Sequence, residues 1–232
     1  MGGKDEDRWT RPVLALIVLV PMAFNAVMLW PQLLPAVYGN DAAWHYTFIR
    51  AASAALANGD NPFDFWMPDT GLGFPQFFYY QHVPHLAVVL LHALLLKRVN
   101  LLMLFNLVQY VLLVVFPLTV YWSLRTMEFS MGAAAVAAAF APLISEPRFF
   151  MGLDFHSYTF IGFGMYTQLW AMHLYFLTTA CLQRLMARGS GYLSAIVFSS
   201  LLVLSHLLYA YMAAFSAFVL FLINLKKEST PA

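Results

Sequence analysis

Two short patterns that pair an aspartate with a histidine could carry chemistry in this sequence. Asp41 and His45 are four residues apart, so a helix would place both side chains on one face. Asp154 and His156 form the second pattern, in a polar stretch between two apolar segments. A carboxylate beside an imidazole can bind a divalent cation, or the histidine can orient a catalytic aspartate. Each pattern also has a purely structural interpretation, with Asp41 as a helix cap and Asp154 in an ordinary polar loop.

Histidines elsewhere in the sequence give further candidates. His206 lies at a polar break in a long apolar segment; it is a functional candidate if it lies at membrane depth and a solvated turn residue if it lies at the surface. His82, His85 and His92 are spaced so that they could ligate a metal, but no carboxylate or cysteine accompanies them. His173 lies inside an apolar segment, where we expect a hydrogen bond to a neighbouring helix.

The composition fixes the broad class of the protein. Of 232 residues, 62% are hydrophobic and 10% are charged, whereas a soluble domain is about 45–50% apolar and roughly 25% charged. Twelve Lys and Arg against eleven Asp and Glu leave no basic excess, which argues against a nucleic-acid partner. A single cysteine, Cys181, excludes an internal disulfide. The remaining class is an all-α, polytopic membrane protein whose partner is the lipid bilayer.

Six apolar segments are predicted to cross the membrane. A transmembrane helix needs about 20 mainly apolar residues to cross a core roughly 30 Å thick. As one helix, Tyr192–Leu225 would be about 51 Å long, and the polar pair Ser205-His206 predicts two short helices instead. The expected spans are Arg11–Leu34, Leu101–Leu124, Met131–Ser145, Tyr166–Leu182 and the two halves of Tyr192–Leu225. A basic loop is predicted at Gln183–Gly191. Together the spans make residues 1–232 a single transmembrane domain.

Two long loops, residues 35–96 and 146–165, connect these spans. In the first loop, Asp41–Leu56 is predicted to be an amphipathic helix that Asn58-Gly59 closes. The Pro- and Gly-rich part that follows is dense in aromatic residues, which is typical of a membrane–water interface. Val83–Leu96 is apolar but short for a span, so we expect a second juxtamembrane helix there.

Two topologies are compatible with this pattern. In the first, Val83–Leu96 lies on the outer face and Tyr192–Leu225 is a hairpin. In the second, Val83–Leu96 spans and Tyr192–Leu225 is one helix, so Asp41 and Asp154 face opposite compartments. Both topologies place eight Lys and Arg inside and four outside, and the positive-inside rule therefore does not decide between them. Segment length favours the first topology, with six spans, both termini in the cytoplasm and both long loops outside.

The first loop resembles that of a known superfamily. The pattern is a span, an Asp-bearing helix start, a helix closed by Asn58-Gly59-Asp60, and an aromatic Pro/Gly stretch. Its sequence elements are Gly39-Asn40-Asp41-Ala42-Ala43-Trp44-His45, Phe65-Trp66-Met67-Pro68 and Gly73-Phe74-Pro75-Gln76-Phe77-Phe78-Tyr79-Tyr80. This pattern resembles the GT-C superfamily of polytopic glycosyltransferases, and within it the membrane proteins labelled 6-pyruvoyl-tetrahydropterin synthase-related.

The resemblance implies a function and roles for particular residues. GT-C enzymes transfer a sugar from a polyprenyl-phosphate donor to an acceptor on the outer face of the membrane, here the plasma (cytoplasmic) membrane. Asp41 matches the first-loop acid that acts as base or metal ligand, and Asp154 is the nearest match to a second acid. Together the two aspartates would hold a divalent cation, Mg or Mn, in a metal-assisted member. His206 falls where relatives contact the donor phosphate. His45 and His156 would complete the cation or acceptor site, and the aromatic loop with Trp66, Tyr79 and Tyr80 would line the acceptor groove or lie at the membrane interface.

The resemblance also implies that the chain is the N-terminal part of a larger GT-C-like protein, because full members usually have ten or more spans. A C-terminal half or a partner membrane protein would then complete it. The alternative from a different class is a non-enzymatic membrane scaffold or transport component of envelope assembly, with Asp41 as a helix cap.

Overall fold

The computed structural model describes residues 3–36, 40–67, 71–143, 145–146, 151–152 and 166–228, and it confirms an all-α protein. The helices are α1 (Gly3–Met28), α2 (Asn40–Asn58), α3 (Gln76–Tyr79), α4 (Val83–Leu94), α5 (Leu101–Thr126), α6 (Met131–Phe140), α7 (Tyr166–Arg188), α8 (Tyr192–Ser205) and α9 (Leu207–Glu228). Two 3₁₀ turns cover Trp30–Leu33 and Ala141–Leu143. The strands form two-residue antiparallel pairs, β1 (Trp66–Met67) with β2 (Phe74–Pro75) and β3 (Ser145–Glu146) with β4 (Met151–Gly152).

Three helices within the described ranges are long and apolar enough to cross a membrane: Arg11–Met28 of α1, Leu101–Thr126 (α5) and Leu207–Leu225 of α9. These helices indicate an integral membrane protein. Helices α4, α6 and α8 are apolar but shorter. Very little of the α1 and α9 spans is covered by the rest of the fold, as expected for helices that face lipid or further helices.

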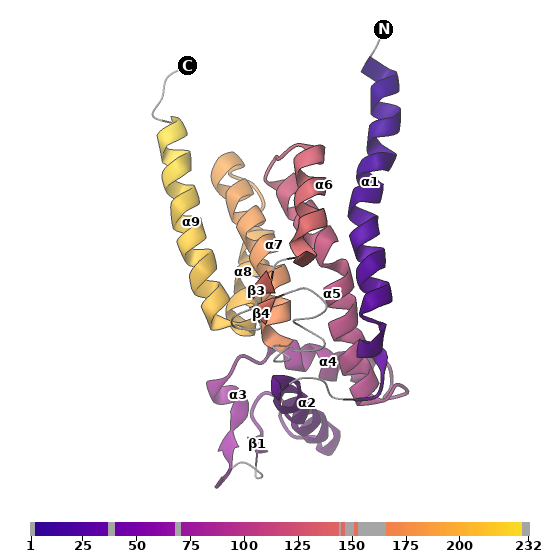
Figure 1. Ribbon diagram of the computed structural model, residues 1–232. Helices are drawn as coiled ribbons and strands as arrows, with labels where there is room; N and C mark the ends of the chain where they lie inside the picture. The colour runs from indigo at the N-terminus through magenta and orange to yellow at the C-terminus, as the bar shows by residue number, and fades with distance from the viewer. Residues whose placement is uncertain are drawn as a thin grey trace.

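The long helices form a bundle, and the shorter elements of the first loop gather at one end of it. In Figure 1 the start of α1 and the end of α9 lie at the same end, whereas α2, α3 and α4 lie at the opposite end. Helix α5 packs against α1, α6 and α7, and α7 packs against α8 and α9. Ala134, Ala135 and Ala138 are fully buried, so the small side chains of α6 let it approach its neighbours closely.

Caps and glycines set several helix ends. The Asn100 side chain accepts hydrogen bonds from the backbone N–H groups of Leu102 and Met103, at 2.9 and 3.3 Å, which starts α5. Gly59, with φ of 82°, follows the end of α2 at the predicted place.

Two predicted boundaries are wrong. Helix α7 runs to Arg188, so the first part of the basic loop predicted at Gln183–Gly191 is helical, and the chain leaves the helix only at Gly189, with φ of 62°. Helix α1 ends at Met28, and Pro31 lies in the 3₁₀ turn that follows, so the predicted first span Arg11–Leu34 is not one continuous helix.

Candidate functional site

Helix α2 places the first predicted pair of residues at the end of the bundle. Asp41 lies in its first turn and is partly exposed, and His45 follows one turn later. Ala42, His45, Ile49 and Ala52 are buried, and their spacing of three, four and three residues defines a single face of the helix. Asp41 therefore lies at the edge of the face that α2 buries.

The buried face of α2 is joined to α4 by a pair of histidines. His45 Nδ1 and His85 Nε2 lie 3.0 Å apart, so one ring donates its N–H to the other. His45 is 5% exposed and His85 is fully buried. Aromatic rings enclose the pair, with centroids 5.3–6.4 Å from one or both imidazoles: Phe48, Phe77, Tyr80 and Tyr166.

Burial keeps both histidines neutral. It lowers the pKa of His45 to about 4, with a smaller contribution from the charge of His206. Burial also lowers the pKa of His85 well below its usual value, and the charge of His45 acts in the same direction. At neutral pH the pair is therefore an uncharged hydrogen-bonded contact between two elements.

His206 reaches the same end of the bundle from the other half of the chain. It is the single residue between α8 and α9, with extended backbone, and it confirms the predicted break in Tyr192–Leu225. Its ring is half-buried and packs edge-on against Tyr209, at 5.2 Å between centroids. Burial lowers the pKa of His206. Helix α8, which ends at Ser205, packs against α4, the helix that carries His85.

Other predicted site residues differ in exposure. Tyr80 lies beside His45, and its hydroxyl is 3.4 Å from that of Thr167 on α7. Tyr79 and Trp66 are exposed, at 74% and 60%. The positions of Asp154 and His156 are outside the described residues, so the prediction that Asp154 joins Asp41 stays a prediction.

Among the described residues, no group of three His, Cys, Asp or Glu side chains could hold a metal ion. His45 makes its described hydrogen bond to His85. His92, from the predicted His82–His85–His92 set, instead bonds the carbonyl of Val99 at 3.0 Å. His173 has the structural role expected for it, because it contacts the Thr119 hydroxyl at 2.7 Å and the Leu112 carbonyl at 2.9 Å, both on α5.

Buried hydrogen bonds hold the layer of α2 and α4 on the bundle. The Tyr166 hydroxyl donates to the carbonyl of Pro84 at 2.7 Å, which links the start of α7 to α4. The Asn106 amide donates to the carbonyls of Leu34 and Ala36, at 2.8 and 2.9 Å. The two bonds of Asn106 fix the chain just before α2 against α5, and the Tyr166 bond fixes α4 to α7. Buried polar contacts therefore position both α2 and α4 on the bundle.

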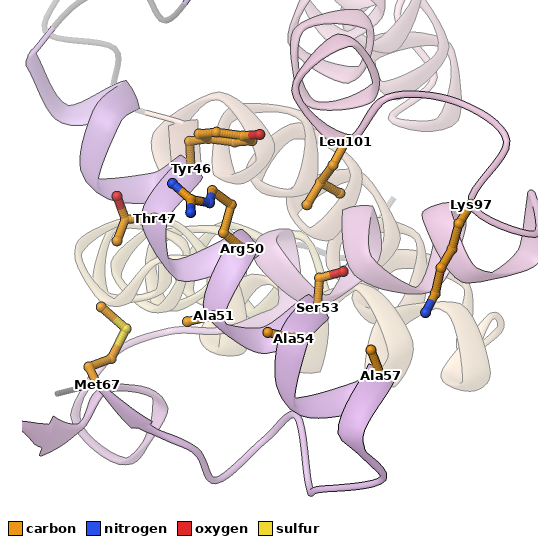
Figure 2. A pocket seen from close by; sticks show the side chains of 10 residues that line it. All are labelled: Tyr46, Thr47, Arg50, Ala51, Ser53, Ala54, Ala57, Met67, Lys97 and Leu101. Atoms are coloured by element: carbon orange, nitrogen blue, oxygen red, sulfur yellow. The ribbon is translucent and has the colours of Figure 1, made fainter. Parts of the chain in front are cut away.

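A groove of about 510 Å³ lies along another face of α2 (Figure 2). Arg50 comes from the helix, and Lys97 comes from the turn between α4 and α5. The remaining lining residues supply hydroxyl groups and apolar contacts: Tyr46, Thr47, Ala51, Ser53, Ala54, Ala57, Met67 and Leu101. This groove is the second polar feature of the layer.

Sequence reasoning missed three of these contributors: His85 as the partner of His45, and Arg50 and Lys97 as cations of one groove. The spacing indicated only that Arg50 lies on the side of the helix opposite Asp41, because nine residues make two and a half helical turns. Comparison with protein-family models, curated proteins and solved structures finds no match to this chain.

Proposed function

We propose that this protein is a GT-C-like membrane glycosyltransferase that transfers a sugar from a polyprenyl-phosphate donor to an acceptor. The observation that carries the proposal is the position of Asp41. It lies partly exposed in the first turn of α2, one turn before His45, at the end of the bundle that His206 also reaches. The motif that resembles the GT-C first loop and the break that resembles its phosphate contact therefore lie at the same end of the fold.

In the proposed topology, α1, α5 and α9 cross the plasma membrane, and α6, α7 and α8 complete the six predicted spans, although α6 and α8 have 10 and 14 helical residues, fewer than the about 20 of a full crossing. The start of α1 and the end of α9 lie at one end of the bundle (Figure 1), in keeping with cytoplasmic termini on both. The layer of α2, α3 and α4 then lies on the outer face, where a lipid-linked donor would be used.

The proposed reaction is a direct displacement at the anomeric carbon of the donor sugar. The acceptor hydroxyl oxygen forms a bond to this carbon, and the bond from the carbon to the phosphate oxygen breaks. The acceptor proton passes to Asp41, and the electron pair of the broken bond leaves with polyprenyl phosphate. His206 faces the departing phosphate and donates an N–H to it, since a neutral imidazole still carries one donor.

The proposed positioning role of His45 follows from its surroundings. A buried imidazole with a pKa of about 4 is a weak base, so His45 is not the proton acceptor. Its bond to His85 fixes the rotation of α2 about its axis and thereby the direction of Asp41. Tyr79, Tyr80 and Trp66 would border the acceptor.

The resemblance also implies a divalent cation in some members. Here the described residues supply one carboxylate at this face, Asp41, and no set of three ligands that fits a metal ion. The described donor set does not fit Mg or Mn, and the reaction above is therefore written through the side chains alone.

Asp41→Asn tests the proposal, with Asp60→Asn as the matched control in the same loop. We expect Asp41→Asn to reduce sugar transfer from a polyprenyl-phosphate donor by about 10²–10⁴-fold, as for loss of a general base. Asp60→Asn should retain wild-type transfer, and both variants should elute as the wild type in size-exclusion chromatography. Full transfer by Asp41→Asn would refute the enzyme and favour the non-enzymatic scaffold, in which Asp41 is a cap.

A further inference from the structure

The groove beside Arg50 and Lys97 is separate from the face that carries Asp41. Nine residues at 100° each place Arg50 about 180° around α2 from Asp41. The groove residues Thr47, Arg50 and Ala57 come from this outward side of the helix, whereas Ala42, His45 and Ile49 are buried against the bundle. A ligand in the groove would thus contact neither member of the histidine pair. Any role of the groove is therefore separate from that of the face that carries Asp41.

Two cations line the groove, Arg50 and Lys97. Within the described ranges the one ion pair is that of Arg188 with Glu128, so neither cation has an ion-pair partner among the described residues. Arg50 comes from α2 and Lys97 from the α4–α5 turn, and Figure 2 shows their charged groups toward opposite ends of the lining, with Ser53 between them. An anionic group in the groove would be attracted by both charges.

A neighbouring pocket has the opposite charge. It shares Ala51 and Ala54 with the groove but is lined by Asp60 and Asp64. An anion is repelled from that pocket and attracted to the end of the groove that carries Arg50. The positive potential is therefore confined to the groove.

The turn that carries Lys97 is fixed by backbone bonds. The N–H of Leu96 bonds the carbonyl of Ala93, and the N–H of Lys97 bonds the carbonyl of His92, each at 2.9 Å, which is a Schellman ending of α4. Leu96 and Lys97 both have positive φ, 53° and 57°, a conformation that non-glycine residues rarely adopt. The His92 ring then bonds Val99 at 3.0 Å. The position of Lys97 is therefore set by the fold, at the expense of an unfavourable backbone conformation.

Apolar side chains beside the cations indicate where the ligand comes from. Leu94 and Leu96 are 79% and 71% exposed, directly before Lys97. Exposed leucines next to basic side chains are typical of a segment that lies in the membrane interface, with its leucines among acyl chains and its cations at the headgroups. Inorganic phosphate has no apolar part that could contact these leucines.

We propose that the groove binds the phosphate-bearing headgroup of an anionic membrane lipid, attracted by the charges of Arg50 and Lys97, with the lipid chains against the leucines that precede Lys97. This site lies on the opposite side of α2 from Asp41, so the proposal stands whether or not the protein transfers a sugar. Its effect would be to hold the α2–α4 layer at the membrane surface.

The test is lipid binding to the purified full chain in detergent, measured by native mass spectrometry. The probes are dioleoyl phosphatidylglycerol, zwitterionic dioleoyl phosphatidylcholine, and inorganic phosphate. We expect preferential binding of phosphatidylglycerol and a loss of about thirtyfold in its affinity in the double variant Arg50→Gln/Lys97→Gln, or about fivefold for each charge. Titration in detergent is preferred to vesicle binding, because a vesicle surface attracts every cation near it.

Arg98→Gln is the matched control, because Arg98 is exposed, adjacent to Lys97 and not part of the groove lining. It should leave the affinity for phosphatidylglycerol unchanged, and the charge-conserving double variant Arg50→Lys/Lys97→Arg should retain the preference. An equal loss in Arg98→Gln, or unchanged binding by Arg50→Gln/Lys97→Gln, would overturn the proposal. Displacement of the lipid by millimolar inorganic phosphate would overturn the assignment to a lipid.

Discussion

The histidine pair between α2 and α4 should make the stability of this protein depend on pH between about 4 and 6.5. In the folded chain burial lowers the pKa of His45 to about 4, whereas in the unfolded chain the same imidazole has its ordinary pKa near 6.5. The described groups that face His45 are imidazoles and phenols: His85, His206, Tyr80 and Tyr166. No carboxylate among them would stabilise the protonated form.

The sign and size of the effect follow from linkage. Between pH 6.5 and pH 4 the unfolded state binds a proton that folded His45 does not, so the free energy of unfolding falls as the pH falls. The contribution of His45 is about 2 kcal/mol lost at pH 5 and about 3 kcal/mol at pH 4, at 1.36 kcal/mol per pKa unit. His85 acts in the same direction, since its pKa is also lowered.

The assay compares the wild type with His45→Asn, whose amide can replace Nδ1 as a partner of His85 but cannot be protonated. Reversible unfolding in detergent at pH 7 and pH 5 gives the drop in free energy for each protein. We expect the drop to be about 2 kcal/mol smaller in His45→Asn. His92→Asn, outside the pair, should show the wild-type drop. Equal drops in the wild type and His45→Asn would refute the conclusion that His45 is buried as a neutral ring.

Two further substitutions test the elements that position the layer. Asn106→Leu removes the bonds to Leu34 and Ala36, so we expect a loss of about 1–3 kcal/mol in the free energy of unfolding, and a loss below 0.5 kcal/mol would contradict this role. Gly73→Ala would bring a Cβ atom into a clash with Nε1 of Trp66 at a φ of 81°, so we expect the β1–β2 hairpin to open and become sensitive to protease. Gly71→Ala, where φ is also positive but no atom lies within 4 Å, separates backbone strain from the clash and should remain more resistant.

Much of the helix pattern could be predicted from the sequence because apolar runs and caps are local signals. The helix predicted over Leu101–Leu124 is confirmed, since α5 covers it, Asn100 caps it, and it is long and apolar enough to cross a membrane. The break at His206 followed from the length of Tyr192–Leu225, and two helices meet there. The predicted end of α7 is too early. The prediction assigns Arg184 and Arg188 to a loop, although basic residues are common in the last turn of a helix.

The site could be predicted only in part, because its contacts join residues far apart in the sequence. The spacing of Asp41 and His45 indicated a shared helix face, which is a local property. That His45 would meet His85 depends on how α2 crosses α4, and that His206 would lie nearby depends on how the α8–α9 break reaches the same end of the bundle. Neither packing angle is encoded in a short motif. The prediction that Asp154 joins Asp41 concerns residues outside the described ranges and stays a prediction.

Helix α2 has two faces with opposite electrostatic requirements, and this difference constrains any role for the layer. The inner face contacts α4 through neutral, buried imidazoles, so it is stable only where they remain unprotonated. The outer face carries Arg50, and Lys97 lines the same groove, so two positive charges favour a bound anion over an empty site. An anionic lipid on the outer face would therefore stabilise the docked position of α2 by mass action, without touching Asp41. If Asp41 is the base of a glycosyltransferase, its activity should then rise with the anionic lipid content of the membrane, and this dependence should disappear in Arg50→Gln/Lys97→Gln.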